Sequence, residues 1–228
     1  MLFDLGGTLL EETSVDIDAG AKRLLDISKN PRGETHEEVQ RIADQLEEEI
    51  RGRREESQMI PATSFQALLY DGLGISFELS QEEVALEFWN HGCEMKPEVG
   101  MCRLLDTLKA ASIRMGVVSN SVYSGNILEK ELEKHDLLDC FDFLMSSADY
   151  GFRKPHPKLF STALGKLELR AADTWFAGDS IKYDVAGAQQ MGLFTVWYNR
   201  KQASPTSPKP DLKVETWDEL TDMLLEYT

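Results

Sequence analysis

The feature that most constrains the fold is an alternation of short apolar runs with helical patterns in the second half of the chain. The runs at 115–118, 141–145, 174–177 and 194–198 are short and mostly apolar, as expected of strands that are buried on both faces of a sheet. Between such runs, apolar residues recur at helical spacing, as in 159–167. The alternation predicts a parallel sheet with helices on both faces.

Two further segments complete the predicted α/β fold, a doubly wound, Rossmann-like sheet. Leu2 and Phe3 form an additional strand, and 212–214 forms a candidate edge strand. Because a strand that begins at residue 2 is short, a trimmed N-terminus is one explanation of this start.

The rhythm of strand and helix breaks between residues 13 and 95. Apolar residues there keep helical spacing, and we find no strand candidate between them. We therefore expect an all-helical cap domain at 13–95, inserted into a core domain made of 1–12 and 96–228.

The charge of the chain restricts its partners. Lysine and arginine number 24 against 40 aspartates and glutamates, which gives a formal net charge of −16. Such a field repels nucleic acid and anionic membranes, so we expect neither as a partner. An anionic substrate then needs a local cation, a bound metal or backbone amides, which favours a small substrate and a metal.

Cysteine content and hydropathy indicate a cytoplasmic protein. The 3 cysteines have no pair spacing that suggests a zinc site or a disulfide framework. No apolar run approaches the ~20 residues that a membrane-spanning helix needs, and the first residues do not resemble a signal peptide.

Polar stretches follow four of the predicted strands, at the sheet edge where α/β proteins bind ligands. The first places Asp4 before Gly6 and Gly7, whose backbone can approach an anion closely, and the second places Ser119 and Asn120 after a strand. Taken alone, the first stretch is equally a turn capped by its aspartate, and the second a turn or a helix N-cap.

The other two stretches supply a cation and two more carboxylates. Lys154 directly precedes Pro155 in 151–157, and Asp179 and Asp184 follow a strand and begin the next helix. Each stretch also has a purely structural interpretation. Lys154 can be an ordinary solvated lysine, and Asp179 and Asp184 can be an N-cap aspartate and a first-turn aspartate of the next helix. Two neighbouring carboxylates are also a typical site for Mg²⁺, which takes one or two of them and completes its shell with water and substrate oxygens.

Taken together and in this order, the four stretches resemble the motifs of the haloacid dehalogenase superfamily. The resemblance covers nearly the whole chain, and 151–157 and 178–188 are similar to the branch with a helical cap, which includes the phosphoglycolate phosphatases. It implies a Mg²⁺-dependent hydrolase, a phosphatase of a small phosphorylated metabolite, as a monomer or weak homodimer whose cap closes over the site.

The resemblance also implies roles for individual residues. Asp4 is the nucleophile that becomes an aspartyl phosphate. Mg²⁺ is bound by Asp4, the backbone carbonyl of Gly6, Asp179 and, through water, Asp184.

The phosphoryl group is bound by a second set of residues that the resemblance indicates. Ser119 and Lys154 are catalytic and neutralise its oxygens, while Gly7, Thr8 and Asn120 help to hold and position it.

One position departs from the family pattern. Phosphatases of this family carry a second aspartate two residues after the nucleophile, as acid for the leaving group and base for water, but here that residue is Gly6. Loss of such a group typically costs ~10²–10⁴ in rate. The metal site is not affected, because glycine still has a backbone carbonyl.

Gly6 leaves four hypotheses open. In the first, the protein is a phosphatase for good leaving groups, or one that takes a substitute acid from the cap or the substrate, with His156 as a further source of the proton. In the second, it is a dehalogenase, although that branch needs no metal. In the third, it is a phosphonate-cleaving enzyme, which needs a cap lysine to react with its substrate, and the cap contains only Lys22 and Lys29. In the fourth, it is a catalytically silent member of the family that binds a phosphorylated ligand.

Overall fold

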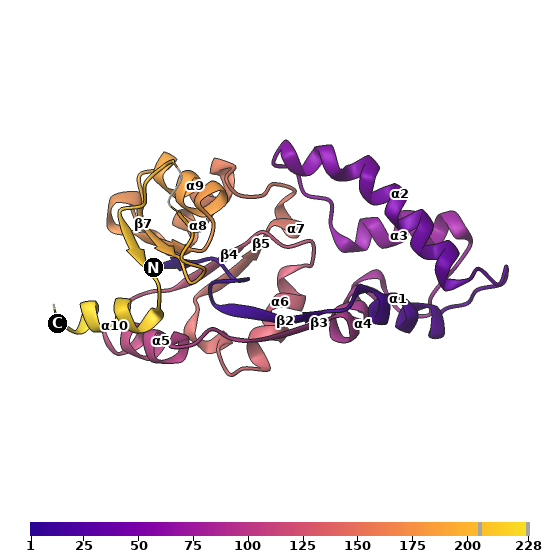
Figure 1. Ribbon diagram of the computed structural model, residues 1–228, viewed down its shortest axis with the longest axis horizontal. Helices are drawn as coiled ribbons and strands as arrows, with labels where there is room; N and C mark the ends of the chain where they lie inside the picture. Colours follow the sequence, from indigo (N-terminus) through magenta and orange to yellow (C-terminus); the bar gives the residue numbers. More distant parts are fainter. Residues whose placement is uncertain (205–206, 227–228) are drawn as a thin grey trace.

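A six-stranded parallel sheet forms the centre of the larger part of the molecule (Figure 1). The computed structural model describes residues 1–204 and 207–226. The strand order is β5-β4-β1-β6-β7-β8, so the chain winds outward from β1 in both directions, as predicted. The strands are β1 (Leu2–Phe3), β4 (Gly116–Ser119), β5 (Phe143–Ser146), β6 (Trp175–Gly178), β7 (Phe194–Tyr198) and β8 (Leu212–Val214).

Helices cover both faces of this sheet, because the side chains of its strands alternate between two apolar clusters. In β1, Leu2 packs into one cluster and Phe3 into the other, and neither is exposed. The cluster around Phe3 includes residues of α5 (Met101–Ala110), α6 (Gly125–Glu133) and α10 (Trp217–Glu226), and the cluster around Leu2 includes residues of α8 (Pro157–Leu167) and α9 (Ala186–Gln190). A short helix α7 (Ser147–Tyr150) follows β5.

The residues between 17 and 92 form four helices with an apolar core of their own, here called the cap helices. They are α1 (Ile17–Asp26), α2 (His36–Glu55), α3 (Ala62–Leu73) and α4 (Gln81–Gly92). Their buried cluster contains Leu24, Val39, Leu69, Tyr70, Ile75 and Val84. The helical spacing seen in the sequence is thus confirmed, and Figure 1 shows these helices gathered at the end of the molecule away from β7.

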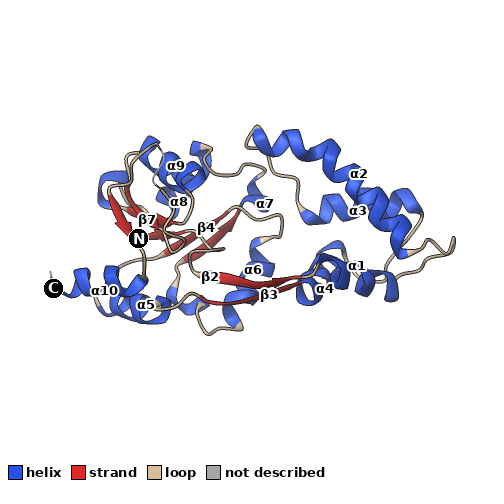
Figure 2. Cartoon of the chain, in the orientation of Figure 1, coloured by secondary structure: helices blue, strands red, loops and turns tan. Residues whose placement is uncertain are grey.

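The prediction that residues 13–95 contain no strand was wrong at both ends of the segment. β2 (Leu10–Val15) and β3 (Cys93–Pro97) pair as an antiparallel ribbon that leads from the sheet to the cap helices (Figure 2). β2 is mostly polar and exposed, with the sequence Leu-Glu-Glu-Thr-Ser-Val, so it lacks the apolar signal of a buried strand. Its partner lies about eighty residues away, which no local pattern reveals.

The cap helices contact the core through α4 and α6. The indole Nε1 of Trp89 donates to the buried carboxylate of Glu131 over 2.8 Å, and the Lys134 ammonium donates to Asn90 over 3.1 Å. On the opposite side, the backbone N–H of Ala62 donates to the carbonyl of Val122 over 2.7 Å. These contacts place the cap helices over the edge of the sheet where its strands end. None of the helices in the described ranges is both long and apolar enough to cross a bilayer.

Candidate active site

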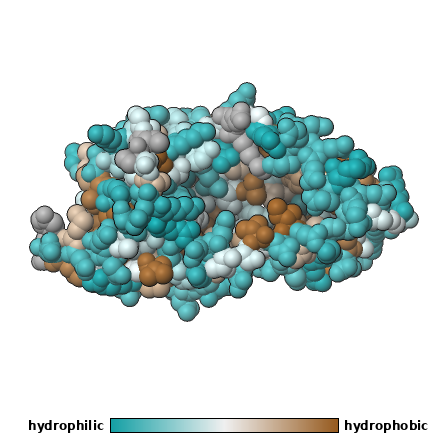
Figure 3. All heavy atoms as spheres, in the orientation of Figure 1, coloured by the Kyte–Doolittle hydropathy of each residue, from teal (hydrophilic) through white to brown (hydrophobic). Residues whose placement is uncertain are grey.

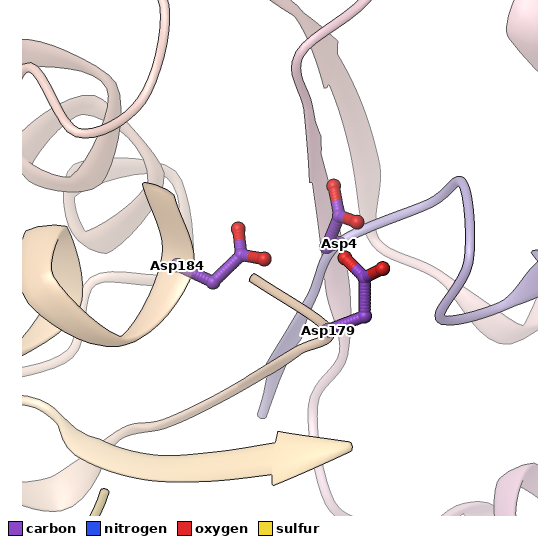
Figure 4. Close-up of side chains that lie close together, drawn as sticks. All are labelled: Asp4, Asp179 and Asp184. Atoms are coloured by element: carbon purple, nitrogen blue, oxygen red, sulfur yellow. The ribbon is translucent and has the colours of Figure 1, made fainter. Parts of the chain in front are cut away.

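Three carboxylates converge where the two central strands end (Figure 4). Asp4 directly follows β1, Asp179 directly follows β6, and Asp184 lies in the π-helical turn Ile181–Val185 that comes next. Because β1 and β6 are adjacent and parallel, their carboxyl ends meet at the same edge. One oxygen of each carboxylate lies within 4.8 Å of the others, so the three predicted residues are brought together.

The ammonium group of Lys154 lies between two of these carboxylates. Its Nζ is 2.6 Å from Asp4 Oδ1 and 2.7 Å from Asp184 Oδ1, and the side chain is 1% exposed. Burial lowers the pKa of this ammonium, but the charges of Asp184 and Asp4 outweigh that effect and raise it, which keeps Lys154 charged.

Asn120 holds the backbone of Lys154 in place. Its side-chain Oδ1 accepts from the Lys154 N–H over 2.7 Å, and its Nδ2 donates to the Lys154 carbonyl over 3.0 Å. Both polar atoms of its side-chain amide therefore position the lysine here, and the role at the phosphoryl group that the resemblance implies for Asn120 stays a prediction. Ser119, at the end of β4, is 5% exposed and lines the cavity above the carboxylates.

The turn after Asp4 folds back on itself. Thr8 is fully buried, and its hydroxyl donates to Asp4 Oδ2 over 3.3 Å, so it orients the carboxylate. Gly7 has a φ of +74°, a conformation that L side chains rarely adopt, and its N–H donates to the Leu10 carbonyl over 2.7 Å. Thr8 and Gly7 thus shape the turn, and their part in binding the phosphoryl group stays a prediction.

Two of the three carboxyl groups, those of Asp179 and Asp184, have raised pKa values. Burial raises the pKa of Asp179 to about 6, and the charge of Asp4 adds to the effect. Burial also raises the pKa of Asp184, while the Lys154 ammonium opposes this. Because ionising all the carboxylates is unfavourable with only one ammonium between them, a second cation at this place would be favourable.

The donor set and the backbone around it fit a hard cation such as Mg²⁺. Carboxylate oxygens are the ligands that such a cation prefers, and this cluster offers one from each of three residues. Two glycines make room for them: a Cβ at Gly178 would lie 2.4 Å from Asp184 Cγ, and a Cβ at Gly7 would lie 2.8 Å from Asp179 Oδ2. The close approach of backbone and carboxylates therefore requires glycine at both positions.

A cavity of about 640 Å³ opens above the carboxylates. Its lining includes four basic residues, Arg153, Lys154, Arg200 and Lys201, and four acidic ones, Asp4, Glu12, Asp179 and Asp184. The local charge is therefore balanced in spite of the strongly negative chain, which allows an anion to enter once a divalent cation is bound.

The side of the cavity toward the cap helices is apolar. Trp89, Met95, Tyr123 and Leu128 line it, and the rings of Trp89 and Tyr123 pack edge to face with centroids 4.7 Å apart. Figure 3 shows hydrophobic residues in the hollow between the two parts of the molecule. This wall offers packing for the part of a substrate that carries no charge.

Several cavity residues were not found from the sequence. Glu12 lies on the unpredicted strand β2, and Arg153 belongs to the 151–157 stretch, where only Lys154 was singled out. Arg200 reaches the cavity because it pairs with Glu11 at 2.7 Å and with Glu98 at 3.0 Å. The only available signal was their position beside motif residues, which does not distinguish them from surface charges.

Gly178→Ala is expected to destabilise the protein by about 1–3 kcal/mol, the usual cost of overpacking. The added methyl group would overlap Asp184 and push it away from Lys154. Gly165→Ala is the matched control, because nothing lies within 4 Å of its Cβ position on α8, and alanine there stabilises a helix by up to ~1 kcal/mol. Urea unfolding of both variants measures the difference, and equal stabilities would contradict the tight packing at Gly178.

Comparison with known families identifies the fold and the motifs. Residues 1–198 match the family described as haloacid dehalogenase-like hydrolase. The chain belongs to this family. The resemblance inferred from the four stretches is thereby confirmed.

Curated relatives of this haloacid dehalogenase-like hydrolase include several phosphatases. A ribulose-1,5-bisphosphate 5-phosphatase of Halopiger xanaduensis is 28% identical over 129 residues, which make up 53% of each chain. A glyceraldehyde 3-phosphate phosphatase of Pyrococcus abyssi is 29% identical over 101 residues, covering 43% of this chain and 41% of that one. The pyrimidine 5'-nucleotidase YjjG of Escherichia coli is 27% identical over 133 residues, 58% of each. The aligned segments span about half the length of these relatives.

Solved structures of the family share the whole fold. A phosphatase from Thermococcus onnurineus superposes with a TM-score of 0.68 at 24% identity, covering 98% of this chain and 96% of that one. A 2-haloacid dehalogenase from Pseudomonas syringae gives a TM-score of 0.69 at 22% identity, covering 100% and 98%. Since a phosphatase and a dehalogenase superpose equally well, the fold of this haloacid dehalogenase-like hydrolase does not choose between the two reactions.

Proposed function

We propose that this hydrolase is a Mg²⁺-dependent phosphatase that acts on a small phosphorylated metabolite through an aspartyl phosphate at Asp4. The observation that carries the proposal is the buried ammonium of Lys154, which contacts both Asp4 and Asp184 at the floor of the cavity. Phosphoryl transfer needs an oriented nucleophile and fixed positive charge beside the phosphoryl oxygens, and this arrangement provides both.

Each residue of the floor has a part in this reaction. A carboxylate oxygen of Asp4, oriented by Thr8 and Lys154, attacks phosphorus while the bond to the leaving oxygen breaks. Lys154 and the Ser119 hydroxyl stabilise the charge on the phosphoryl oxygens. Mg²⁺ would be held by Asp4, the Gly6 carbonyl, Asp179 and, through water, Asp184, and would supply further positive charge when bound.

The cap contributes closure and selection. In this proposal residues 13–95 are the cap and residues 1–12 and 96–228 the core, with β2 and β3 as the connections. The cap excludes water from the cavity, and its apolar wall, to which Trp89 and Met95 belong, selects the substrate.

Two alternative reactions are disfavoured by the side chains. A dehalogenase needs no metal, so the assembly of three carboxylates within 4.8 Å would serve no purpose in it. A phosphonate-cleaving enzyme needs a cap lysine at the substrate, but Lys22 pairs with Asp18, Lys29 pairs with Glu78, and neither lysine lines the cavity.

The proposed partner is a small molecule alone. The net charge of −16 disfavours nucleic acid and anionic membranes, and the four basic cavity residues give an anion a local place to bind. We also propose a cytoplasmic location and a monomer or weak homodimer, which gel filtration can test.

The proposal predicts Mg²⁺-dependent release of phosphate from p-nitrophenyl phosphate and from a sugar phosphate. Removal of Mg²⁺ with EDTA is expected to lower the rate to background, because the carboxylate cluster without a cation repels the anionic substrate. Added Mg²⁺ is expected to restore the rate. Colorimetric phosphate release measures this. If Mg²⁺ and inorganic phosphate bind, as calorimetry reports, while no phosphate ester is hydrolysed, the protein is a binding protein and the proposal is wrong.

A further inference from the structure

Hydrolysis of a phosphate ester with a poor leaving group needs a proton donor that Gly6 cannot supply. The leaving oxygen must be protonated when its bond to phosphorus breaks, and water must lose a proton when it attacks the aspartyl phosphate. A group that does both must carry a titratable proton and reach the space above Asp4.

The side chain of Glu12 reaches the space that Gly6 leaves open. A Cβ built on Gly6 would have one neighbour within 4 Å, the Oε1 atom of Glu12 at 3.9 Å. Glu12 also lines the cavity together with Asp4. Its carboxylate therefore lies beside the place that a side chain at position 6 would occupy.

The backbone explains how a residue of the ribbon comes to the nucleophile. The Leu10 N–H donates to the Leu5 carbonyl over 3.0 Å, and the Gly7 N–H donates to the Leu10 carbonyl over 2.7 Å. This tight turn returns β2 to the end of β1 and so brings back Glu12, which lies eight residues after Asp4 in the sequence. The pairing register then shifts between Glu12 and Ser14, a type of irregularity that redirects side chains and is common near active sites.

Glu12 differs from the neighbouring acid on the same strand. Glu11 accepts from Arg200 and pairs with Lys96 at 3.1 Å. The carboxylate of Glu12, in contrast, has neither an ion pair nor a hydrogen bond with the residues that the structure describes. It is free to exchange a proton with a substrate or a water molecule.

The other carboxyl groups that line the cavity are already engaged. Asp4 and Asp184 contact Lys154, and Asp179 belongs to the carboxylate cluster. His156, the alternative proton source considered from the sequence, does not line the cavity: its Nδ1 accepts from the Lys158 N–H at the start of α8.

We propose that Glu12 is the general acid and base of this enzyme, an assignment that rests on the proposed phosphatase function. Asp4 attacks phosphorus, the bond to the leaving oxygen breaks, and that oxygen takes the proton of the Glu12 carboxyl group. A water molecule then attacks the aspartyl phosphate and gives a proton to the Glu12 carboxylate. The bond between phosphorus and Asp4 breaks, which releases phosphate and restores both carboxyl groups to their starting states.

The first test is Glu12→Gln, which keeps the shape of the side chain and removes the proton donor. We expect kcat/KM for a sugar phosphate to fall by about 10²–10⁴, because its alkoxide leaving group needs a proton. For p-nitrophenyl phosphate we expect a much smaller fall in kcat/KM, together with a rapid burst of one nitrophenol per enzyme and slow turnover afterwards. The control is Glu94→Gln on the exposed side of β3, which changes the charge equally and does not line this cavity.

The second test restores the acid from the position beside it. A Cβ at Gly6 would have Glu12 itself as its nearest neighbour, at 3.9 Å, so Gly6→Asp in the Glu12→Gln background has room for its first side-chain carbon. We expect kcat/KM for the sugar phosphate to be at least about tenfold higher in the double variant than in Glu12→Gln, because a carboxyl group is again present beside Asp4.

The outcomes separate this assignment from the proposed function. If the wild-type protein hydrolyses neither substrate, the phosphatase proposal fails, and the role of Glu12 fails with it. Two results would show that the protein is a phosphatase whose acid and base is not Glu12. In the first, the wild type is active and Glu12→Gln lowers kcat/KM equally for both substrates without a burst. In the second, Gly6→Asp restores no sugar phosphatase activity to the Glu12→Gln variant.

Discussion

Asp4→Asn is expected to lower kcat for phosphate ester hydrolysis by at least about 10⁴-fold, as removal of a covalent nucleophile does. The amide has the shape of the carboxylate but is too weak a nucleophile to attack phosphorus. Lys154 keeps Asp184 as a partner at 2.7 Å, so we expect the variant to remain folded. The loss then reports on chemistry rather than on stability.

The same variant tests the covalent intermediate directly. Wild-type protein quenched in acid during turnover should carry one phosphoryl group on the peptide that contains Asp4, detected by mass spectrometry and removed by hydroxylamine. Asp4→Asn should carry none. Asp71→Asn, an exposed aspartate on α3, makes the same change of charge and should behave as the wild type. Turnover that persists in Asp4→Asn would exclude Asp4 as the nucleophile.

The sheet could be predicted because its strands are buried on both faces and therefore apolar throughout. The predicted run at 194–198 coincides with β7, and Leu2 and Phe3 coincide with β1. The same reasoning placed Asp4 and Asp179 at one edge of the sheet, because both come directly after predicted strands. That they share a cation was implied by the family resemblance, and the pairing of β1 with β6, which brings them side by side, was not predicted.

The ribbon β2–β3 could not be predicted, and for this reason the position of Glu12 beside the cavity could not be predicted either. A polar two-stranded ribbon has no apolar face to mark it, and its pairing of Glu12 with Met95 joins residues far apart in the sequence. The contact of Trp89 with Glu131 between cap and core is hidden for the same reason. Such pairings depend on the tertiary fold rather than on local patterns.

The direction of individual side chains was also beyond the sequence. That Asn120 holds the backbone of Lys154 could not be predicted, because it depends on how closely the 151–157 loop passes the end of β4. A motif names which residues gather at a site. Which of them touch the ligand and which hold the others is decided by distances of a few ångströms that the motif does not contain.

Lys154→Met is expected to destabilise the fold by about 3–5 kcal/mol, because it removes the ammonium that contacts two carboxylates of a buried group. Methionine has similar length and packs in the same space, so the change isolates the charge. Asp4 and Asp184 would then face each other with no ammonium between them. We also expect kcat to fall at least about 10²–10³-fold, the usual effect of removing one group that stabilises charge in the transition state.

Two further variants distinguish this electrostatic cause from a packing defect. Lys201→Met removes an equal charge from the rim of the same cavity, where the side chain is exposed, and should change stability by no more than about 0.5 kcal/mol. Lys154→Met combined with Asp184→Asn removes one of the stranded carboxylates and should recover part of the lost stability, but not the activity. If urea unfolding finds Lys154→Met as stable as the wild type, the ion pair does not hold the floor of the site together. If the double variant is less stable than the single one, the loss arises from packing, because relief of charge repulsion can only act in the opposite direction.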